Sequence, residues 1–191
     1  MMKRLLTAAA CAVSMLTLPA CGMLPSASDP VREQQYVSVV NSLSWTDATS
    51  GKRDGRRSSW PLDKLSGQVE AFPLAQLKQC DGAGACAWGM LRAERKLVRY
   101  SYVPGGVKLE LELMLDVDRR QEAHGDDYHA AMAVPSDVPV LRMSKTVQPS
   151  VILEYGKVHH VQFDYGVRFD VCALRYDAAG GALDHCDIPY I

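Results

Sequence analysis

One stretch of sequence decides the fold class: Val107-Lys108-Leu109-Glu110-Leu111-Glu112-Leu113-Met114-Leu115-Asp116-Val117-Asp118, in which apolar and polar side chains alternate. In an extended strand successive side chains point to opposite faces, so the aliphatic residues share one face. The charged residues share the other face, together with Met114. This stretch therefore predicts a β-strand with one buried and one solvated face.

The flanking sequence predicts that this strand belongs to a long hairpin. Residues 91–103 are rich in β-forming residues toward their end and lead into Pro104-Gly105-Gly106. Proline presets φ for a turn and glycine supplies a positive φ. Residues 161–173 alternate in the same way, so we expect a second long strand there, with a bulge or bend at Gly166.

Shorter candidate elements complete the expected fold. Further strands are expected at residues 36–45, 138–143 and 151–158, and short helices at residues 61–65, 73–79 and 126–132. About seven strands joined by tight turns predict an all-β fold, an antiparallel two-sheet β-sandwich of Ig-like or transthyretin-like type with few short helices. A partly open barrel is the second choice.

Composition excludes several classes of protein. The chain has 191 residues, of which 48% are hydrophobic and 23% charged, and 21 basic residues balance 22 acidic ones. Such a chain is globular rather than disordered, and it has no overall basic excess for binding nucleic acid. No apolar run reaches the roughly 18 residues that a transmembrane helix requires.

The N-terminus is typical of an exported protein. Met1-Met2-Lys3-Arg4 is a short positive leader, and residues 5–18 are largely apolar and uncharged, which predicts a secretory signal peptide. The following Leu18-Pro19-Ala20-Cys21 resembles the lipobox of bacterial lipoproteins, although proline is unusual at its second position. The resemblance covers residues 1–21 and implies cleavage before Cys21 and acylation of its thiol. The alternative is an ordinary signal peptide followed by a chance cysteine.

The resemblance implies three segments. Residues 1–20 are the cleaved signal peptide, residues 21–35 a lipidated cysteine and flexible tether, and residues 36–191 a single β-sandwich domain. Several acyl chains on one cysteine give stable membrane attachment. In lipoproteins of Gram-negative bacteria an Asp after the cysteine commonly marks inner-membrane retention, and this chain has Gly22 there. We therefore expect the outer membrane, at its periplasmic face rather than the cell surface.

Four cysteines remain after Cys11 is removed with the signal peptide and Cys21 is acylated. Of the three possible pairings in an oxidising compartment, we expect disulfides Cys80–Cys86 and Cys172–Cys186. The first closes a glycine-containing loop, and the second spans a hairpin whose turn is centred on Ala179. A four-thiolate zinc site and a redox dithiol are the alternatives, but neither the metal-knuckle nor the Cys-x-x-Cys spacing is present.

Two segments stand out as candidate sites. Lys52, Arg53, Arg56 and Arg57 lie in an expected flexible segment between Trp45 and Trp60, and with Trp60 they form the candidate partner-binding surface. The alternative is a solvated loop with both tryptophans in the core.

Histidines supply the other candidates. His124-Gly125-Asp126-Asp127-Tyr128-His129 contains metal-ligand side chains but matches no metal motif, so a solvated loop is the alternative. His159 and His160 are neighbours on an expected strand and cannot jointly bind one ion there. We expect one to be exposed and the other half-buried.

The sequence favours binding over catalysis. It contains no nucleophile elbow, phosphate-binding loop or dinucleotide fingerprint, so we predict no catalytic residue, no metal and no cofactor. We expect an outer-membrane-anchored accessory or scaffolding subunit of a bacterial cell-envelope assembly, with the membrane and an envelope protein as partners. A free-standing periplasmic or surface module that binds a ligand or inhibits an enzyme is the alternative. A metal-dependent enzyme using residues 124–129 is the third.

Replacing the predicted acylation site tests the anchor. In the Cys21→Ser variant, incorporation of a clickable fatty acid is expected to disappear and unprocessed precursor to accumulate, because the thiol that carries the acyl chains is lost. Metabolic labelling followed by mass spectrometry of the N-terminus measures both effects. Unchanged labelling in the variant would contradict the lipobox.

Overall fold

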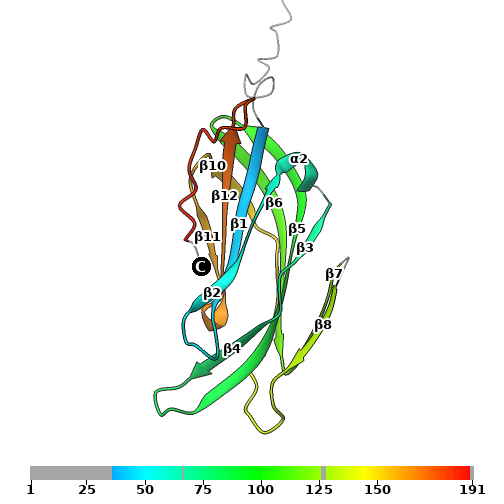
Figure 1. The fold of residues 1–191 in the computed structure, drawn as a ribbon, viewed down its shortest axis with the longest axis vertical. Helices are drawn as coiled ribbons and strands as arrows, with labels where there is room; N and C mark the ends of the chain where they lie inside the picture. The colour runs from blue at the N-terminus through cyan, green and yellow to red at the C-terminus, as the bar shows by residue number, and fades with distance from the viewer. Residues whose placement is uncertain (1–35, 66, 126–127, 190–191) are drawn as a thin grey trace, which may run out of the picture. The chain divides into compact units, whose positions relative to one another are not determined.

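The computed structural model describes residues 36–65, 67–125 and 128–189, all of which fall in one compact unit of the chain (Figure 1). The predicted signal peptide, the lipobox with Cys21 and the tether lie outside the described residues. Within the described ranges, no helix is long and apolar enough to cross a membrane.

The described residues are built almost entirely from strands. The one α-helix described among them, α2, covers Leu62–Leu65, and a 3-10 turn, η1, covers Asp164–Gly166. The strands are β1 (Tyr36–Thr46), β2 (Arg53–Pro61), β3 (Val69–Ala71), β4 (Ala75–Cys80), β5 (Cys86–Val103), β6 (Gly106–Asp118), β7 (Arg120–Gly125), β8 (Tyr128–Ala133), β9 (Met143–Val147), β10 (Ser150–Glu154), β11 (His159–Gln162) and β12 (Arg168–Tyr176).

The strands form two main antiparallel sheets. The β1 sheet has the order β11-β12-β1-β2. The β6 sheet has the order β10-β6-β5-β3, with β9 also pairing with β6 and β4 also pairing with β5. The hairpin of β7 and β8 is a separate pair whose strands contact β5.

The inner faces of the two sheets share one hydrophobic core. Leu43 of β1 and Phe169 of β12 belong to the same buried cluster as Leu111 and Leu113 of β6, all at most 2% exposed. Phe72, between β3 and β4, meets Phe169 edge to face with ring centroids 6.5 Å apart. Burying one such side chain contributes about 1.5 to 3 kcal/mol, so the shared core stabilises both sheets together. The predicted all-β antiparallel sandwich is confirmed.

The hairpin of β5 and β6 forms as predicted. Gly105 turns the chain with a φ of 74°, and the aliphatic row of β6 faces the core while its polar row is partly exposed. On the polar face opposite charges lie directly across the two strands, as in the pair of Lys96 with Glu112. Gly106 permits the close approach of β10, because an added Cβ there would lie 2.2 Å from the carbonyl oxygen of Leu153.

The second long strand predicted at residues 161–173 is wrong, because the chain reverses within it. Strands β11 and β12 pair antiparallel across the turn at Asp164–Gly166, where the Phe163 N–H donates to the Val167 carbonyl at 2.9 Å. Tyr165 and Gly166 both have positive φ, as a type I′ hairpin turn requires. The period-two alternation continues through this tight turn, so the pattern alone does not reveal the reversal.

Two of the three predicted helices are wrong. Residues 73–79 contain most of β4, and residues 126–132 contain part of β8, with Asp126 and Asp127 outside the described residues. Pairing with the long strand β5 overrides the local signal in the first case, where Ala75 and Leu77 alternate into the core. The short helix at residues 61–65 is confirmed as α2.

The remaining short strands are displaced from their predicted bounds. Within residues 138–143 only Val140 forms a bridge, to Trp88, and β9 begins at Met143. The strand predicted at residues 151–158 is β10, which ends at Glu154.

Both predicted disulfides are present, Cys80–Cys86 and Cys172–Cys186. The chain turns after β12 between Asp177 and Gly181, and in the returning arm, as far as residue 189, the one bridge joins Tyr176 to Ala182. Cys186 therefore lies on an irregular segment rather than on the second strand of a hairpin. This segment covers part of the outer face of β12, where Ile188 packs near Cys172.

An ion pair provides a second attachment for the C-terminal segment. Arg175 Nε donates to Asp184 Oδ2 at 2.8 Å, and Arg175 Nη2 donates to Oδ1 at 2.9 Å. The pKa of Asp184 lies below its ordinary value of 3.8, chiefly because Arg175 donates these side-chain hydrogen bonds. Two parallel charge-assisted bonds to a carboxylate that is 14% exposed contribute about 1.5 to 3 kcal/mol.

Asp184→Asn is expected to lower the free energy of unfolding by about 1 to 3 kcal/mol at pH 7. Because the folded-state pKa lies below the unfolded value, this stabilisation is complete above pH 3.8 and is lost as pH falls through the folded-state pKa. Urea titrations of both proteins between pH 7 and pH 3 measure the difference, which should shrink at the acid end. A difference independent of pH would contradict the assigned ion pair.

Candidate functional site

The basic segment singled out in the sequence is a strand, not the flexible loop that was predicted. Strand β2 pairs antiparallel with β1 from Thr46 opposite Arg53 to Ser38 opposite Pro61. The sequence pattern fails here because β2 carries few apolar residues. Its conformation is instead imposed by the neighbouring strand β1, nine of whose residues are buried.

The strand register divides the candidate residues between two faces. Arg53 and Arg57 lie opposite Thr46 and Ser42, on the outer face of the β1 sheet. Arg56 and Trp60 lie opposite the core residues Leu43 and Val39, so they project along the opposite face at the open edge of the sheet.

The two tryptophans have different environments. Trp45 is 5% exposed and belongs to the core, whereas Trp60 is 41% exposed. The candidate surface is therefore a basic edge strand with Trp60 near one end and Lys52 just before the other. The alternative that placed both tryptophans in the core is wrong for Trp60.

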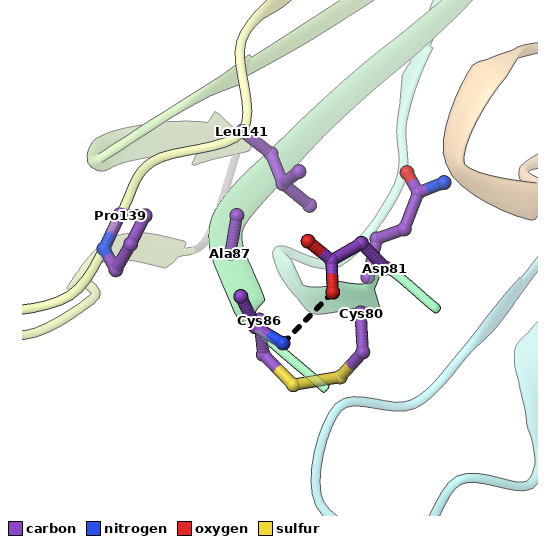
Figure 2. A pocket seen from close by; sticks show the side chains of 8 residues that line it. Cys80, Asp81, Cys86, Ala87, Pro139 and Leu141 are labelled. Carbon is purple, nitrogen blue, oxygen red and sulfur yellow. Dashed lines mark hydrogen bonds between the residues drawn. A yellow bond between two sulfur atoms is a disulfide. The ribbon is translucent and has the colours of Figure 1, made fainter. Parts of the chain in front are cut away.

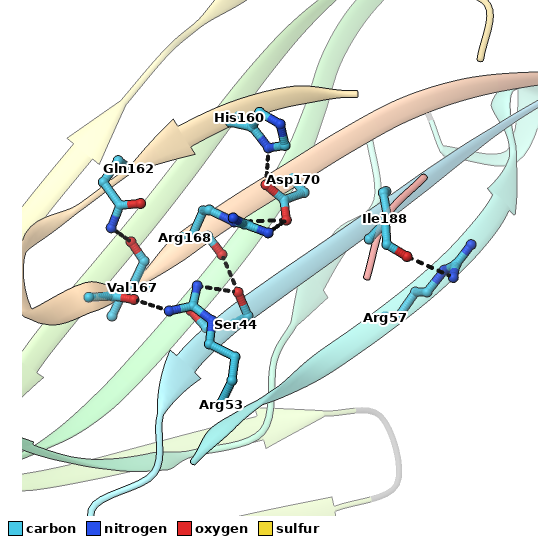
Figure 3. A network of polar contacts seen from close by, with 10 residues as sticks. Ser44, Arg53, Arg57, His160, Gln162, Val167, Arg168, Asp170 and Ile188 are labelled. Carbon is cyan, nitrogen blue, oxygen red and sulfur yellow. Dashed lines mark hydrogen bonds and ion pairs between the residues drawn. The ribbon is translucent and has the colours of Figure 1, made fainter. Parts of the chain in front are cut away.

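Arg53 is held in one position by several acceptors, as Figure 3 shows. Its Nη1 donates to the Gly166 carbonyl at 2.7 Å, and its Nη2 donates to Ser44 Oγ at 2.6 Å. Burial lowers the pKa of Arg53, and the positive charge of Arg168 lowers it further, while Asp170 partly opposes both effects. The guanidinium fastens β2 to β1 and to the turn between β11 and β12.

Asp170 is the central carboxylate of this outer face. It is 1% exposed, and it contacts His160 Nδ1 at 2.5 Å and Arg168 Nη2 at 2.8 Å (Figure 3). The side chain of His160 is 55% exposed, and both His159 and His160 are exposed residues, so the expected half-buried histidine is wrong. The polar cluster of Ser44, Arg53, His160, Arg168 and Asp170 joins strands β1, β2, β11 and β12. Its position could not be predicted from the sequence, because it depends on the register of these strands.

A hydrolase triad requires a different order of residues from the one on this face. Ser42 lies opposite Asp170, and Asp170 lies opposite His160, so the carboxylate stands between the serine and the histidine. In a catalytic triad the histidine stands between them. Ser42 is also fully buried, and its Oγ has no hydrogen-bond partner among the described residues. The order of these three residues therefore differs from that of a catalytic triad.

A second candidate surface lies at the tip of the hairpin formed by β4 and β5. Cys80 and Cys86 are the last paired residues before a five-residue turn, and the disulfide joins them there. Asp81 Oδ1 accepts hydrogen bonds from the backbone N–H groups of Ala83 and Ala85, both at 2.9 Å. The turn is exposed but held rigid by these bonds and by the disulfide.

A shallow hollow adjoins this tip (Figure 2). It has a volume of about 350 Å³, and its wall is made by the tip and by Pro139 and Leu141 of the segment before β9. That segment is attached to β5, because the backbone N–H of Trp88 donates to the Pro139 carbonyl at 2.9 Å. The two walls of the hollow are therefore fixed relative to each other.

The histidine-containing segment spans the hairpin of β7 and β8. His124 and His129 are opposite each other in the register, and Asp126 and Asp127 lie outside the described residues. Within the described part of the chain, no group of three or more His, Cys, Asp or Glu side chains is placed to hold a metal ion.

Comparisons of the chain with protein-family models, with curated proteins and with solved structures find no match. Function is therefore inferred from the geometry of the chain itself. Among the described residues, the candidate binding surfaces are the basic edge strand β2 and the disulfide-closed tip.

Neutralising two different arginines of β2 is expected to change the free energy of unfolding by different amounts. Arg53→Gln should lower the free energy of unfolding by about 1 to 2 kcal/mol, because it removes charged donors from Ser44 and Gly166. Arg56→Gln, the matched control on the same strand, should change stability by less than about 0.5 kcal/mol, as exposed substitutions do. Chemical denaturation measures both. Equal losses of stability in the two variants would contradict the assignment of Arg53 to a hydrogen-bonded face of β2 and of Arg56 to an exposed face.

Proposed function

We propose that the protein is an outer-membrane lipoprotein that acts as an accessory binding subunit of a bacterial cell-envelope assembly. It is attached through Cys21 and contacts an envelope protein through β2. The membrane anchor rests on the lipobox resemblance, and the contact surface rests on the described strands. No cofactor is assigned to this function.

The observation that carries the proposal is the position of β2 at the edge of a rigid sheet. Arg56 and Trp60 are exposed there, while Arg53 on the same strand is fixed by hydrogen bonds. Arginine and tryptophan are enriched among the residues that contribute most to protein interfaces. A fixed strand also presents them without a large cost of ordering a loop on binding.

A short tether would suit such a contact. The 14 residues from Gly22 to Gln35 span about 20 Å as a flexible coil and at most about 50 Å when extended. Attachment keeps the domain near its leaflet and raises its local concentration beside membrane partners. A modest contact surface is then sufficient for stable association.

A second candidate function is a ligand-binding or enzyme-inhibitor module that uses the Cys80–Cys86 tip. The observation that favours it is the exposed, cross-linked turn beside an apolar hollow. Preorganised protruding loops bind with little loss of conformational entropy. This function requires neither the anchor nor β2, which allows the two candidates to be separated.

Photo-cross-linking in native membranes tests the first candidate. A photoreactive amino acid replaces Trp60, and the same probe replaces the 64% exposed Ile152 of β10 as a matched control. We expect a discrete protein adduct from position 60 and none from position 152. Adding Arg56→Glu should abolish the adduct, because charge reversal opposes an acidic partner surface.

Two outcomes would contradict the proposal. Adducts of equal yield from positions 60 and 152 would indicate random collision. An adduct that persists in the Arg56→Glu variant would show that the contact does not depend on the basic residues of β2. Loss of binding only on removing residues of the Cys80–Cys86 turn would favour the second candidate.

A further inference from the structure

We propose that β2 binds its partner by strand addition, so that an extended acidic segment of another protein becomes the next strand of the β1 sheet. This inference rests on the proposed function, because it specifies the partner chemistry and binding mode of the same surface. It commits to one occupant, an acidic polypeptide in extended conformation.

The backbone of β2 is oriented for such pairing. The Asp47 N–H donates to the Lys52 carbonyl at 2.9 Å, which fixes the alternation of hydrogen-bonded pairs between β1 and β2. From that register, Asp54, Arg56, Ser58 and Trp60 direct their backbone groups toward β1. The intervening positions direct theirs toward the opposite edge, where Ser59 lies and where the Gly55 N–H donates to Asp54 Oδ1 at 2.7 Å.

That opposite edge is open among the described residues. Strand β2 is the last strand of its sheet, and its main neighbours are β1 and α2. Nine residues give an edge about 30 Å long, ample for a peptide of five to seven residues. Pro61, which has no N–H, ends the edge at a position where the amide would point away from β1.

Side-chain charge selects an acidic occupant. Arg56 projects on one face of the sheet and Arg57 on the other, so an added strand would have a cation beside each of its faces. Arg57 also contacts the Ile188 carbonyl at 3.4 Å, which holds it over the outer face. Acidic residues placed opposite the exposed Arg56 gain cross-strand ion pairs. Trp60 offers an apolar contact at the end of the same edge.

The same charges disfavour the simplest competing occupant, a second copy of this chain. Edge-to-edge pairing of two β2 strands would bring together three arginines and one aspartate, Asp54, from each copy, so positive charges would outnumber negative ones. Like charges across a strand pair are destabilising. Arg53 carries a further positive charge on the outer face of the same strand. An acidic partner strand relieves this repulsion, whereas a second β2 increases it.

Peptide binding to the purified, detergent-solubilised full-length protein tests the inference. The probe is a fluorescent peptide with the sequence Glu-Val-Glu-Val-Glu-Val-Glu, and fluorescence anisotropy reports binding. The decisive comparison uses the same sequence with every backbone amide N-methylated, which keeps the charge but removes the N–H donors from both edges of the peptide strand. We expect saturable binding of the first peptide and a loss of about tenfold or more in affinity for the second.

Protein variants supply matched controls. Ser59→Pro removes an outward N–H and should weaken binding by about tenfold, whereas Ser59→Ala keeps that N–H and should bind within about twofold of wild type. Arg56→Glu should weaken binding by about tenfold or more, and Lys157→Glu, between β10 and β11 and outside β2, should not. Circular dichroism melting shows whether the proline variant is folded, and the N-methylated peptide tests the inference on wild-type protein in either case.

Several results would overturn strand addition. Equal affinity for the N-methylated peptide would show that charge alone drives binding. Displacement of the peptide by phosphatidylglycerol vesicles, together with tight vesicle binding at β2, would assign the edge to a lipid surface. If the peptide fails to bind while the cross-link from position 60 still depends on Arg56, the proposed function stands and the binding mode is wrong. If both fail, both are wrong.

Discussion

Burial of the aliphatic row of β6 against the β1 sheet is the interaction on which the rest of the structure depends. Leu109, Leu111 and Leu113 are at most 2% exposed, and they belong to the same core cluster as Leu43 and Phe169 of the opposite sheet. Without this layer the buried strand β1 would lose its packing partner, and β2 would lose the only strand with which it pairs in the described residues. The position of the candidate binding edge is therefore a consequence of core packing.

The long hairpin and both disulfides could be predicted from the sequence, because each depends on local information: alternation, turn residues and short cysteine separations. The reversal at Tyr165 could not be predicted, because the alternation of apolar and polar residues continues unchanged through this tight turn. The sequence of β4 predicts a helix, but pairing with β5 determines its conformation. Local helix propensity does not determine the conformation of a segment when a long neighbouring strand supplies its backbone hydrogen bonds.

The candidate site was predicted as a set of residues but not as an arrangement. The basic residues of β2 were identified, yet their division between Arg53, which is fastened, and Arg56, which is exposed, follows from register. The contacts of Asp170 with His160 and Arg168 also depend on strand order. Charged residues on an edge strand commonly prevent unwanted pairing. In this protein the same charges would make pairing selective, because they repel a second copy and attract an acidic strand.

Amide hydrogen exchange of β2 in the free protein tests the central claim, that β2 has one paired and one open edge, most directly. The claim predicts slow exchange at Arg56 and Ser58, whose amides face β1, and fast exchange at Ser59, whose amide faces outward. Exchange resolved by NMR residue by residue would show this alternation. Uniform protection along β2 would mean that another part of the chain covers the edge, and uniform fast exchange would mean that β2 is not a stable strand; either result would contradict the account.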